Sequence, residues 1–388
     1  MRHKAYKFRL WTNANQEREL SIALETHRRL YNAALVERKE SWEQFQIGIN
    51  YCQQSAWYKA QRSENPWFER INFSSAQATL RRLDRSFQAF FRRVKAGEKP
   101  GYPRFKAADR FDSFTFPSHG DGARLTDNRL RVQHIGVIRV KLHRPIEGEI
   151  KTLSLKREAD KWFVIATAAL PAAPKLGNIN PPVGIDVGLE HFLSTSDARH
   201  VANPKFLRSD LPALRRSSRS VSRKKKGGTN RRKAVKRLRK WHAHIANLRR
   251  EHAHKTANFL LDRYGMIAVE RLNIRGMVRN NRLARAISDA GWNQFITILK
   301  SKAENAAVEI VEVDPKGTSQ ECSGCGATVL KKLSVRIHRC NSCGLTLHRD
   351  VNAARNVLSR ACVTGLGTSP SVVRVPVGTL TEEAVCFS

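Results

Sequence analysis

The sequence predicts a multidomain α+β protein: a small β-barrel with a helical insertion, followed by an α/β domain that a cysteine-rich ribbon interrupts. Its 388 residues are too many for one ordinary domain, and 41% of them are hydrophobic, which is enough for real cores. Short alternating apolar runs fill residues 113–169, whereas apolar strands alternate with helical patterns after residue 183. Two Cys-x-x-Cys pairs then fall within residues 322–343.

The first half of the chain predicts a barrel and two long helices. Residues 4–10 alternate like a strand, and helices are expected over residues 16–46, capped by Asn13 or Asn15, and over residues 74–96. The turn-rich run 99–106 ends this helical segment. Further strands of a small barrel or sandwich are expected over residues 113–116, 129–133, 137–142, 149–156 and 161–169. Residues 171–182 contain four prolines and indicate a linker.

The second half predicts short strands separated by helices. Two helices joined at residues 226–230 are expected, and another runs from Asp289 to about Ala306 with Ser288 as its cap. Residues 364–388 are rich in Gly, Pro, Ser and Val and nearly uncharged, so this tail is expected to be poorly ordered. The predicted strands are residues 183–188 and 192–196, at hairpin distance, then 265–270 and 308–313.

The net charge of +36 implies a polyanionic partner, because pairing across helix surfaces would need matching acids. Residues 205–255 alone hold 19 Lys and Arg against two acids. A solvated face is the alternative interpretation of such a run. A membrane surface is disfavoured, since no amphipathic anchor stands out. No apolar run is long enough for a membrane span, and no signal-peptide core is present. The candidate phosphate contacts are Arg81, Arg85, Arg92, Arg93, Arg223, Lys224, Lys225, Arg231, Arg232, Lys236, Arg239 and Arg336.

Four of the seven cysteines follow the pattern Cys-x₂-Cys-x₁₄-Cys-x₂-Cys. Thiolates so spaced close a tetrahedral Zn²⁺ site without an open position, so the predicted zinc is structural and not catalytic. The gap is slightly shorter than the usual span of about 15–20 residues, and redox-active pairs are the alternative. Gly326 and Gly344 follow the two pairs, where the backbone must turn back. The predicted ligands are Cys322, Cys325, Cys340 and Cys343.

Three acids occupy positions that predict a metal-dependent active site. Asp186 lies within an apolar strand, Glu270 ends a later one, and Asp350 opens the last helical pattern. Unpaired carboxylates in apolar strands are costly unless a cation joins them. Salt bridges would explain any one of these acids but not all three in this order. Three carboxylates on two Mg²⁺ ions about 3.5–4 Å apart would suit phosphodiester hydrolysis, as in an RNase H-like nuclease.

Nine short segments carry a resemblance that extends over nearly the whole chain to about residue 360. They are Glu17, Tyr31-Asn32, Leu83-Asp84-Arg85-Ser86-Phe87, Gly101-Tyr102-Pro103-Arg104-Phe105, Gly184-Ile185-Asp186-Val187-Gly188, Val269-Glu270-Arg271-Leu272-Asn273, Ile287-Ser288-Asp289-Ala290-Gly291-Trp292, Thr318-Ser319-Gln320-Glu321-Cys322 and Arg349-Asp350-Val351-Asn352-Ala353-Ala354. Through these segments the sequence resembles the TnpB (OrfB) proteins of bacterial insertion sequences, compact RNA-guided nucleases related to type V CRISPR effectors.

The resemblance implies a set of domain boundaries. A wedge-type β-barrel would comprise residues 1–12 and 100–172, with a helical recognition insertion over residues 13–99 and a linker over residues 173–182. An RNase H-like (RuvC) nuclease domain would comprise residues 183–316 and 346–362, and a zinc ribbon over residues 317–345 would interrupt it. Residues 363–388 would form the tail.

The resemblance also implies an activity. The protein would be a transposon-encoded endonuclease that binds a guide RNA from the transposon end, reads a short motif beside its double-stranded target DNA and hydrolyses the DNA with two-metal chemistry. Asp186, Glu270 and Asp350 match the RuvC carboxylates, and Arg336 could assist near the scissile phosphate. The implied cofactors are two Mg²⁺ and one Zn²⁺. The expected assembly is a monomer with one RNA, in the bacterial cytoplasm and associated with the nucleoid.

Two alternative functions stay open. One is a nuclease-inactive, RNA-guided DNA-binding repressor, and the other is a transposase or transposase accessory protein. The complete set of three acids favours the enzyme over the repressor. Many relatives have an extra acid two residues before the last carboxylate, where this chain has His348. This difference implies tuned activity, although His348 could instead contact phosphate.

Overall fold

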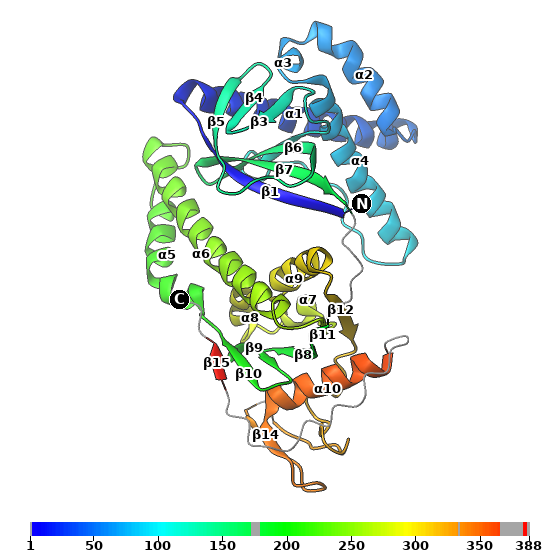
Figure 1. Cartoon of the computed structure of the whole chain (residues 1–388). Coiled ribbons are helices and arrows are strands. Elements are labelled where there is room, and N and C mark those ends of the chain that lie inside the picture. Colours follow the sequence, from blue (N-terminus) through cyan, green and yellow to red (C-terminus); the bar gives the residue numbers. More distant parts are fainter. Residues whose placement is uncertain (1, 172–178, 333, 365–382, 386–388) are drawn as a thin grey trace. The chain divides into compact units, whose positions relative to one another are not determined.

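Strand β1 (Arg2–Trp11) begins the first of two units, residues 1–172 and 173–388, into which the computed structural model divides (Figure 1). The structure describes residues 2–171, 179–332, 334–364 and 383–385. Most of the predicted linker and most of the predicted tail therefore lie outside the described residues. The two units are described separately below.

The sheet of the first unit contains seven antiparallel strands in the order β2-β6-β7-β1-β5-β4-β3 and curls into a nearly closed barrel. Every second side chain of β7 is buried from Trp162 to Leu170, so one face of the strand fills the core. The predicted barrel is confirmed, and only the short strand β3 was not predicted. The strands besides β1 are β2 (Ser113–Phe116), β3 (Ala123–Thr126), β4 (Arg129–Val132), β5 (Gly136–Lys141), β6 (Glu149–Glu158) and β7 (Lys161–Leu170).

Four helices are inserted between β1 and β2: α1 (Ala14–Phe45), α2 (Tyr51–Glu64), α3 (Pro66–Glu69) and α4 (Phe73–Lys95). Asn13 caps α1, because its side chain accepts a bond from the amide of Gln16 while the Gln16 side chain accepts from the amide of Asn13. The other candidate cap, Asn15, lies inside the helix. The two long helices are confirmed, whereas α2 and α3 were not predicted.

Two residues of α1, Asn32 and Arg28, hold the loop after α4. The side chain of Asn32 donates to the carbonyl of Lys106 at 3.1 Å and accepts from its amide at 2.8 Å. Arg28 donates to the same carbonyl at 2.9 Å. The neighbouring residues Tyr31 and Asn32 thus have different roles: the Tyr31 side chain is buried in the core, and the Asn32 side chain positions the loop.

The sheet of the second unit has the order β12-β11-β8-β9-β10-β15. Strands β8, β11 and β12 are parallel to one another, β9 runs antiparallel to β8 and to β10, and β15 is parallel to β10. The tail prediction is thus wrong for residues 383–385, which pair with the backbone of β10. The strands are β8 (Pro182–Val187), β9 (His191–Thr195), β10 (Arg199–Ala202), β11 (Met266–Glu270), β12 (Glu309–Val313) and β15 (Glu383–Val385).

Helices cover both faces of this sheet, as Figure 1 shows. On one face, side chains of β8, β9 and β11 share a core with α6 and α9, including Ile185, Phe192 and Phe295. On the other face, Val357 and Ala361 of α10 pack against Ala268 and Val313. The helices are α5 (Phe206–Ser222), α6 (Thr229–Leu261), α7 (Ile274–Met277), α8 (Ala284–Ala290), α9 (Trp292–Ala306) and α10 (Arg349–Thr364).

The predicted helix start at Ser288 and Asp289 is wrong. Both residues lie inside α8, and the break falls at Gly291, which has a left-handed backbone with φ of 70° and separates α8 from α9. Glycine adopts this conformation without the steric cost that a side chain would add. Asp289 instead joins two other helices, because its carboxylate accepts from the amide of Leu207 at the start of α5 and pairs with Arg249 of α6 at 2.7 Å.

Candidate carboxylate and cysteine sites

Asp186 and Glu270 stand at corresponding points of two neighbouring parallel strands. β8 and β11 pair in a register that places Ile185 opposite Val269, so the next residue on each strand brings Asp186 beside Glu270. Adjacent strands lie about 4.8 Å apart. The carboxyl ends of strands are the usual place for ligands in open α/β sheets. The first two predicted acids therefore meet where such a sheet binds ligands.

Asp350 reaches the same end of the sheet from the first turn of α10. The helix can approach β8 closely because Gly184 has no side chain: a Cβ there would lie 2.0 Å from the carbonyl oxygen of Ala354. At Gly188, a Cβ would lie 3.6 Å from Oδ2 of Asp350, which places this carboxylate over the end of β8. The structure thus brings the three predicted acids together.

Burial and repulsion perturb this group of carboxylates. The atoms around Asp186 remove much of its hydration, and the charges of Glu270 and Asp350 add to this effect, so the pKa of Asp186 lies well above its usual value. Burial also raises the pKa of Glu270. Carboxylates held this close repel one another unless a cation joins them. Oxygen ligands alone suit a hard divalent ion such as Mg²⁺.

Glu270 is oriented by Thr318, a residue whose role was not predicted. The Thr318 hydroxyl donates to Oε1 of Glu270 at 2.5 Å, which opposes the rise of the Glu270 pKa. Thr318 also donates to the carbonyl of Pro315 at 3.0 Å. It is buried, so its hydroxyl is held in one place by both acceptors. The predicted segment 318–322 contained this residue, but only the folded chain shows which acid it contacts.

One side of α10 holds the segment that leads into the ribbon. Asn352, Asn356 and Arg360 are spaced four residues apart and donate to backbone carbonyl oxygens between residues 314 and 321, at 2.6–2.8 Å. Asn352 also accepts from the amide of Ser323 at 2.9 Å. The helix that supplies Asp350 therefore fixes Thr318 and the first cysteine pair as well.

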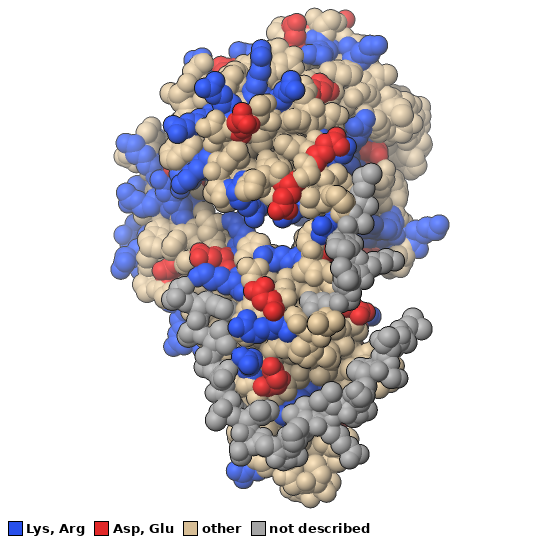
Figure 2. Space-filling model, in the orientation of Figure 1, with Lys and Arg blue, Asp and Glu red and all other residues tan. Residues whose placement is uncertain are grey.

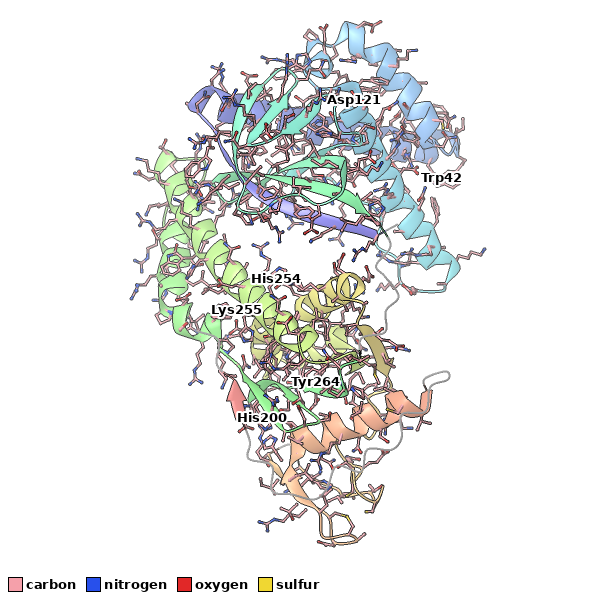
Figure 3. The ribbon with its side chains drawn as sticks, viewed as in Figure 1. Trp42, Asp121, His200, His254, Lys255 and Tyr264 are labelled. Carbon is pink, nitrogen blue, oxygen red and sulfur yellow. The ribbon has the colours of Figure 1, made fainter. Side chains whose placement is uncertain are left out.

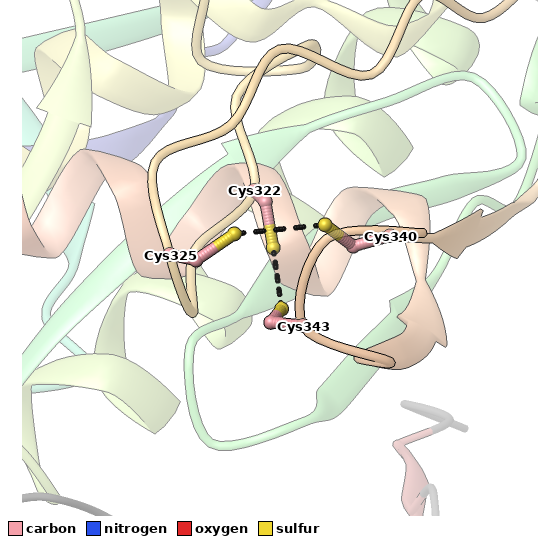
Figure 4. A group of neighbouring side chains, drawn as sticks. All are labelled: Cys322, Cys325, Cys340 and Cys343. Carbon is pink, nitrogen blue, oxygen red and sulfur yellow. Dashed lines mark hydrogen bonds between the residues drawn. The ribbon is translucent and has the colours of Figure 1, made fainter.

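The four predicted cysteines form one cluster (Figure 4). The Sγ atoms of Cys322 and Cys343 are 3.6 Å apart, as are those of Cys325 and Cys340. A disulfide would require about 2.05 Å. Tetrahedral ligands at about 2.3 Å from a zinc ion would be about 3.8 Å apart. The observed separations fit a four-thiolate metal site and exclude disulfides between these partners.

Both halves of the cluster have the same backbone geometry. The amide of Cys322 donates to the carbonyl of Ala327, and the amide of Cys340 donates to that of Leu345, each at 2.9 Å. Gly326 and Gly344 close the turns with φ of 77° and 74°, where a side chain would be strained. A short hairpin of β13 (Ile337–Arg339) and β14 (Thr346–His348) then leads directly into α10.

Ten of the twelve predicted phosphate contacts are exposed, and Lys224 and Arg231 are half-buried. Figure 2 shows Lys and Arg side chains spread over the visible face of each unit. Arg231 is committed to the turn between α5 and α6, because it donates to the carbonyls of Val221 at 2.6 Å and Lys224 at 3.3 Å. Arg336 pairs with Glu190 at 2.8 Å. The guanidinium of Arg81 lies 5.1 Å from the ring centre of Tyr51.

A basic depression on α5 includes residues that were not predicted. Arg215, Arg219 and Arg223 follow one another at four-residue spacing and, with Ser218 and Ser222, line a hollow of about 320 Å³. Guanidinium groups and hydroxyls are suited to phosphate oxygens. The four-residue spacing within a predicted helix was the signal that could have identified Arg215 and Arg219.

Three family models match parts of the chain. Residues 165–281 match a model described as "Probable transposase" (OrfB_IS605), and residues 292–357 match one described as "Cas12f1-like, TNB domain". Residues 1–46 match a model described as "Helix-turn-helix domain". In the structure, residues 2–46 form one strand and one long helix, so this segment is not a helix-turn-helix here.

Two curated relatives align over almost the whole chain. A protein of Streptomyces pristinaespiralis, named as a proposed RNA-guided DNA endonuclease, is 31% identical over 92% of this chain and 89% of its own. The protein InsQ of Escherichia coli (strain K12), named in the same way, is 28% identical over 92% of each chain. A CRISPR-associated endodeoxyribonuclease, Cas12f1 of Sulfoacidibacillus thermotolerans, is 24% identical over 74% of this chain and 77% of its own.

The fold is that of a compact CRISPR effector. It matches a Cas12f1 chain, solved in complex with guide RNA and target DNA, with a TM-score of 0.56 at 14% identity, over 89% of this chain and 83% of that one. The relative that is 31% identical over 92% of this chain shows the family: the chain belongs to the TnpB (OrfB) family of insertion-sequence proteins. Within the described residues, every helix is too short or too polar to cross a membrane.

Proposed function

We propose that the protein is an RNA-guided DNA endonuclease that hydrolyses phosphodiester bonds at Asp186, Glu270 and Asp350. The observation that carries the proposal is the meeting of these three acids at the ends of β8 and β11 and the start of α10. The relatives named as RNA-guided DNA endonucleases support the same activity. On this proposal residues 183–316 and 346–362 form a RuvC-type nuclease domain, and residues 317–345 form its zinc ribbon.

The three carboxylates would hold two Mg²⁺ ions, which when bound supply an activated water and stabilise the leaving 3′-oxygen. Asp186 and Glu270 would bind the ions from strands β8 and β11, and Asp350 would bind them from the first turn of α10. Thr318 keeps one oxygen of Glu270 in place and favours its ionised form. Since the raised pKa values belong to the protein without metal, binding of the cations would also ionise these groups at neutral pH.

The cysteine cluster would hold one structural Zn²⁺. Four thiolates complete a tetrahedral shell, so no position remains for water or substrate. Backbone amides, that of Cys343 foremost, lower the pKa of the Cys340 thiol to about 6, whereas the pKa of the Cys343 thiol is raised to about 12. Without metal the cluster therefore retains protons that a bound Zn²⁺ would displace. The ribbon would therefore act by holding the segment before α10, and the chemistry would stay with the carboxylates.

The basic surfaces would bind the nucleic acids by their backbones. A net charge of +36 suits a guide RNA and a DNA target held along phosphates, with base pairing supplying the sequence specificity. The arginine row on α5 and the exposed basic residues of α4 and α6 are the proposed contacts. We expect one protein monomer per RNA and recognition of a short DNA motif next to the target.

The test is plasmid cleavage by protein co-expressed with its transposon-end RNA, with and without Mg²⁺, in a buffer that leaves the ribbon zinc in place. Wild type is compared with Asp186→Ala and with Glu251→Gln, an exposed acid of α6 that lies outside the site. Cleavage that needs RNA, Mg²⁺ and Asp186, but not Glu251, is expected. RNA-dependent DNA binding without cleavage would favour the repressor, and cleavage without RNA would contradict both functions.

A further inference from the structure

A second group of metal-ligating side chains lies near the carboxylates and belongs to neither site described above. Three residues bring a carboxylate oxygen and two imidazole nitrogens within 4.8 Å of one another. They are Glu190, in the turn before β9, His191, the first residue of β9, and His348, the last residue of β14. The ring centres of His191 and His348 are 5.7 Å apart. His200 of β10, labelled in Figure 3, lies beside both rings, at 4.3 Å and 5.1 Å.

We propose that Glu190, His191 and His348 bind a divalent transition metal ion such as Zn²⁺ or Co²⁺. Imidazole nitrogen suits these ions, whereas Mg²⁺ prefers carboxylate, carbonyl and water oxygens, so the site would differ in selectivity from the carboxylate site. Two histidines and one carboxylate are a known ligand set for zinc with one position left open. Ligand atoms within 4.8 Å need only a small closing movement to reach about 2.1 Å from a shared ion.

The surroundings of the three side chains fit this assignment. Nε of Arg336 forms an ion pair with Oε2 of Glu190 at 2.8 Å, and ligating carboxylates usually have such an outer partner. The amide of Asp350 donates to Nδ1 of His348 at 3.3 Å, a long bond whose loss on metal binding would cost little. The Ser194 hydroxyl and Nδ1 of His200 are 2.8 Å apart, so this third ring is fixed beside the site.

The position of the site suggests what an ion would do. Glu190 and His191 follow the strand of Asp186, and His348 precedes Asp350 by two residues. A shared ion would therefore link the two segments that supply the first and last carboxylates. We assign the ion a structural role: it would fix the start of α10 relative to β8.

The experiment measures metal binding and not activity. Full-length protein with its ribbon loaded with zinc is titrated with Co²⁺ in excess Mg²⁺, followed by Co²⁺ absorption and by the thermal unfolding midpoint (Tm). We expect one equivalent of Co²⁺ that raises the Tm of the wild type. Binding should weaken at least about tenfold in His191→Asn, in His348→Asn and in Glu190→Gln, whose exposed side chain makes misfolding no concern.

Two controls separate this site from the others. His244→Asn, an exposed histidine of α6, should leave the Co²⁺ equivalent unchanged. Asp186→Ala removes a carboxylate of the other site and should also retain it. Absence of the equivalent in the wild type, its persistence in all three ligand variants, or its loss in Asp186→Ala would each overturn the proposal.

Discussion

Gly184→Ala tests whether the contact between β8 and α10 positions Asp350. The new Cβ would lie 2.0 Å from the carbonyl oxygen of Ala354 and 2.7 Å from the amide nitrogen of Leu358, both backbone atoms of α10. Side-chain motion cannot relieve these contacts. The helix must move away by at least about 1 Å before the first contact reaches 3.0 Å. Because Asp350 lies in the first turn of α10, the same movement withdraws its carboxylate from Asp186 and Glu270.

The expected effect on stability is moderate and that on activity is large. Overpacking of this kind costs about 1–3 kcal/mol, which corresponds to a fall in Tm of roughly 2–12 °C for a unit of this size. A misplacement of about 1 Å typically costs about 10²-fold in rate. Thermal unfolding and guided plasmid cleavage below the variant's Tm measure the two effects.

Gly48→Ala is the matched control for Gly184→Ala, because no atom lies within 4 Å of the position that its Cβ would take and its φ is not left-handed. It should match the wild type in both assays. Cleavage by Gly184→Ala within about threefold of the wild type would refute the claim that this contact places Asp350. A Tm equal to that of the wild type would show that α10 can move without cost.

Three further predictions concern the same unit. In Mg²⁺-free buffer, Asp186→Asn should raise the Tm at pH 8. The pKa of Asp186 is raised in the folded protein, so the wild type loses stability as the pH rises from about 4 through that pKa. The difference in Tm between the variant and the wild type should therefore shrink toward pH 4. Thr318→Val removes a bond that lowers the Glu270 pKa, so the acidic limb of the cleavage profile should move to higher pH and half-maximal cleavage should need about tenfold more Mg²⁺. Asp289→Ala should cost about 3 kcal/mol in chemical denaturation, because it unpairs Arg249 and frees the Leu207 amide. Glu304→Ala, at an exposed position of α9, should cost under about 0.5 kcal/mol.

The sequence was most informative where one local signal has one structural meaning. Asn13 was one of two asparagines predicted to cap α1, and the structure shows it in a capping box with Gln16. The same arrangement of Asn50 and Gln53 begins α2. We did not predict α2, a helix in which only Gln54 and Tyr58 are buried. The signal for this helix was therefore in its cap and not in its periodicity.

The roles of single basic residues and the grouping of distant residues were harder to predict, because both depend on tertiary contacts. Arg231 belongs to a run of basic residues that indicates phosphate binding, yet it holds two carbonyls of a turn. Ser288 had the sequence of a cap, but Gly291 sets the boundary of the helix. The grouping of His191 with His348 brings together the start of β9 and the end of β14, which lie far apart in the sequence, so no local pattern reveals it.

The arrangement of α10 explains why the four-cysteine cluster adjoins the three carboxylates in this chain. One turn of the helix supplies Asp350, while Asn352, Asn356 and Arg360 bind the backbone of the segment that enters the ribbon. That segment carries Thr318, which orients Glu270. The positions of the Glu270 and Asp350 carboxylates therefore depend on the contacts between residues 314–323 and α10. Four thiolates that bind a structural ion at the end of this segment would hold it from the other side, so the ion would stabilise the proposed active-site carboxylates without contacting the substrate.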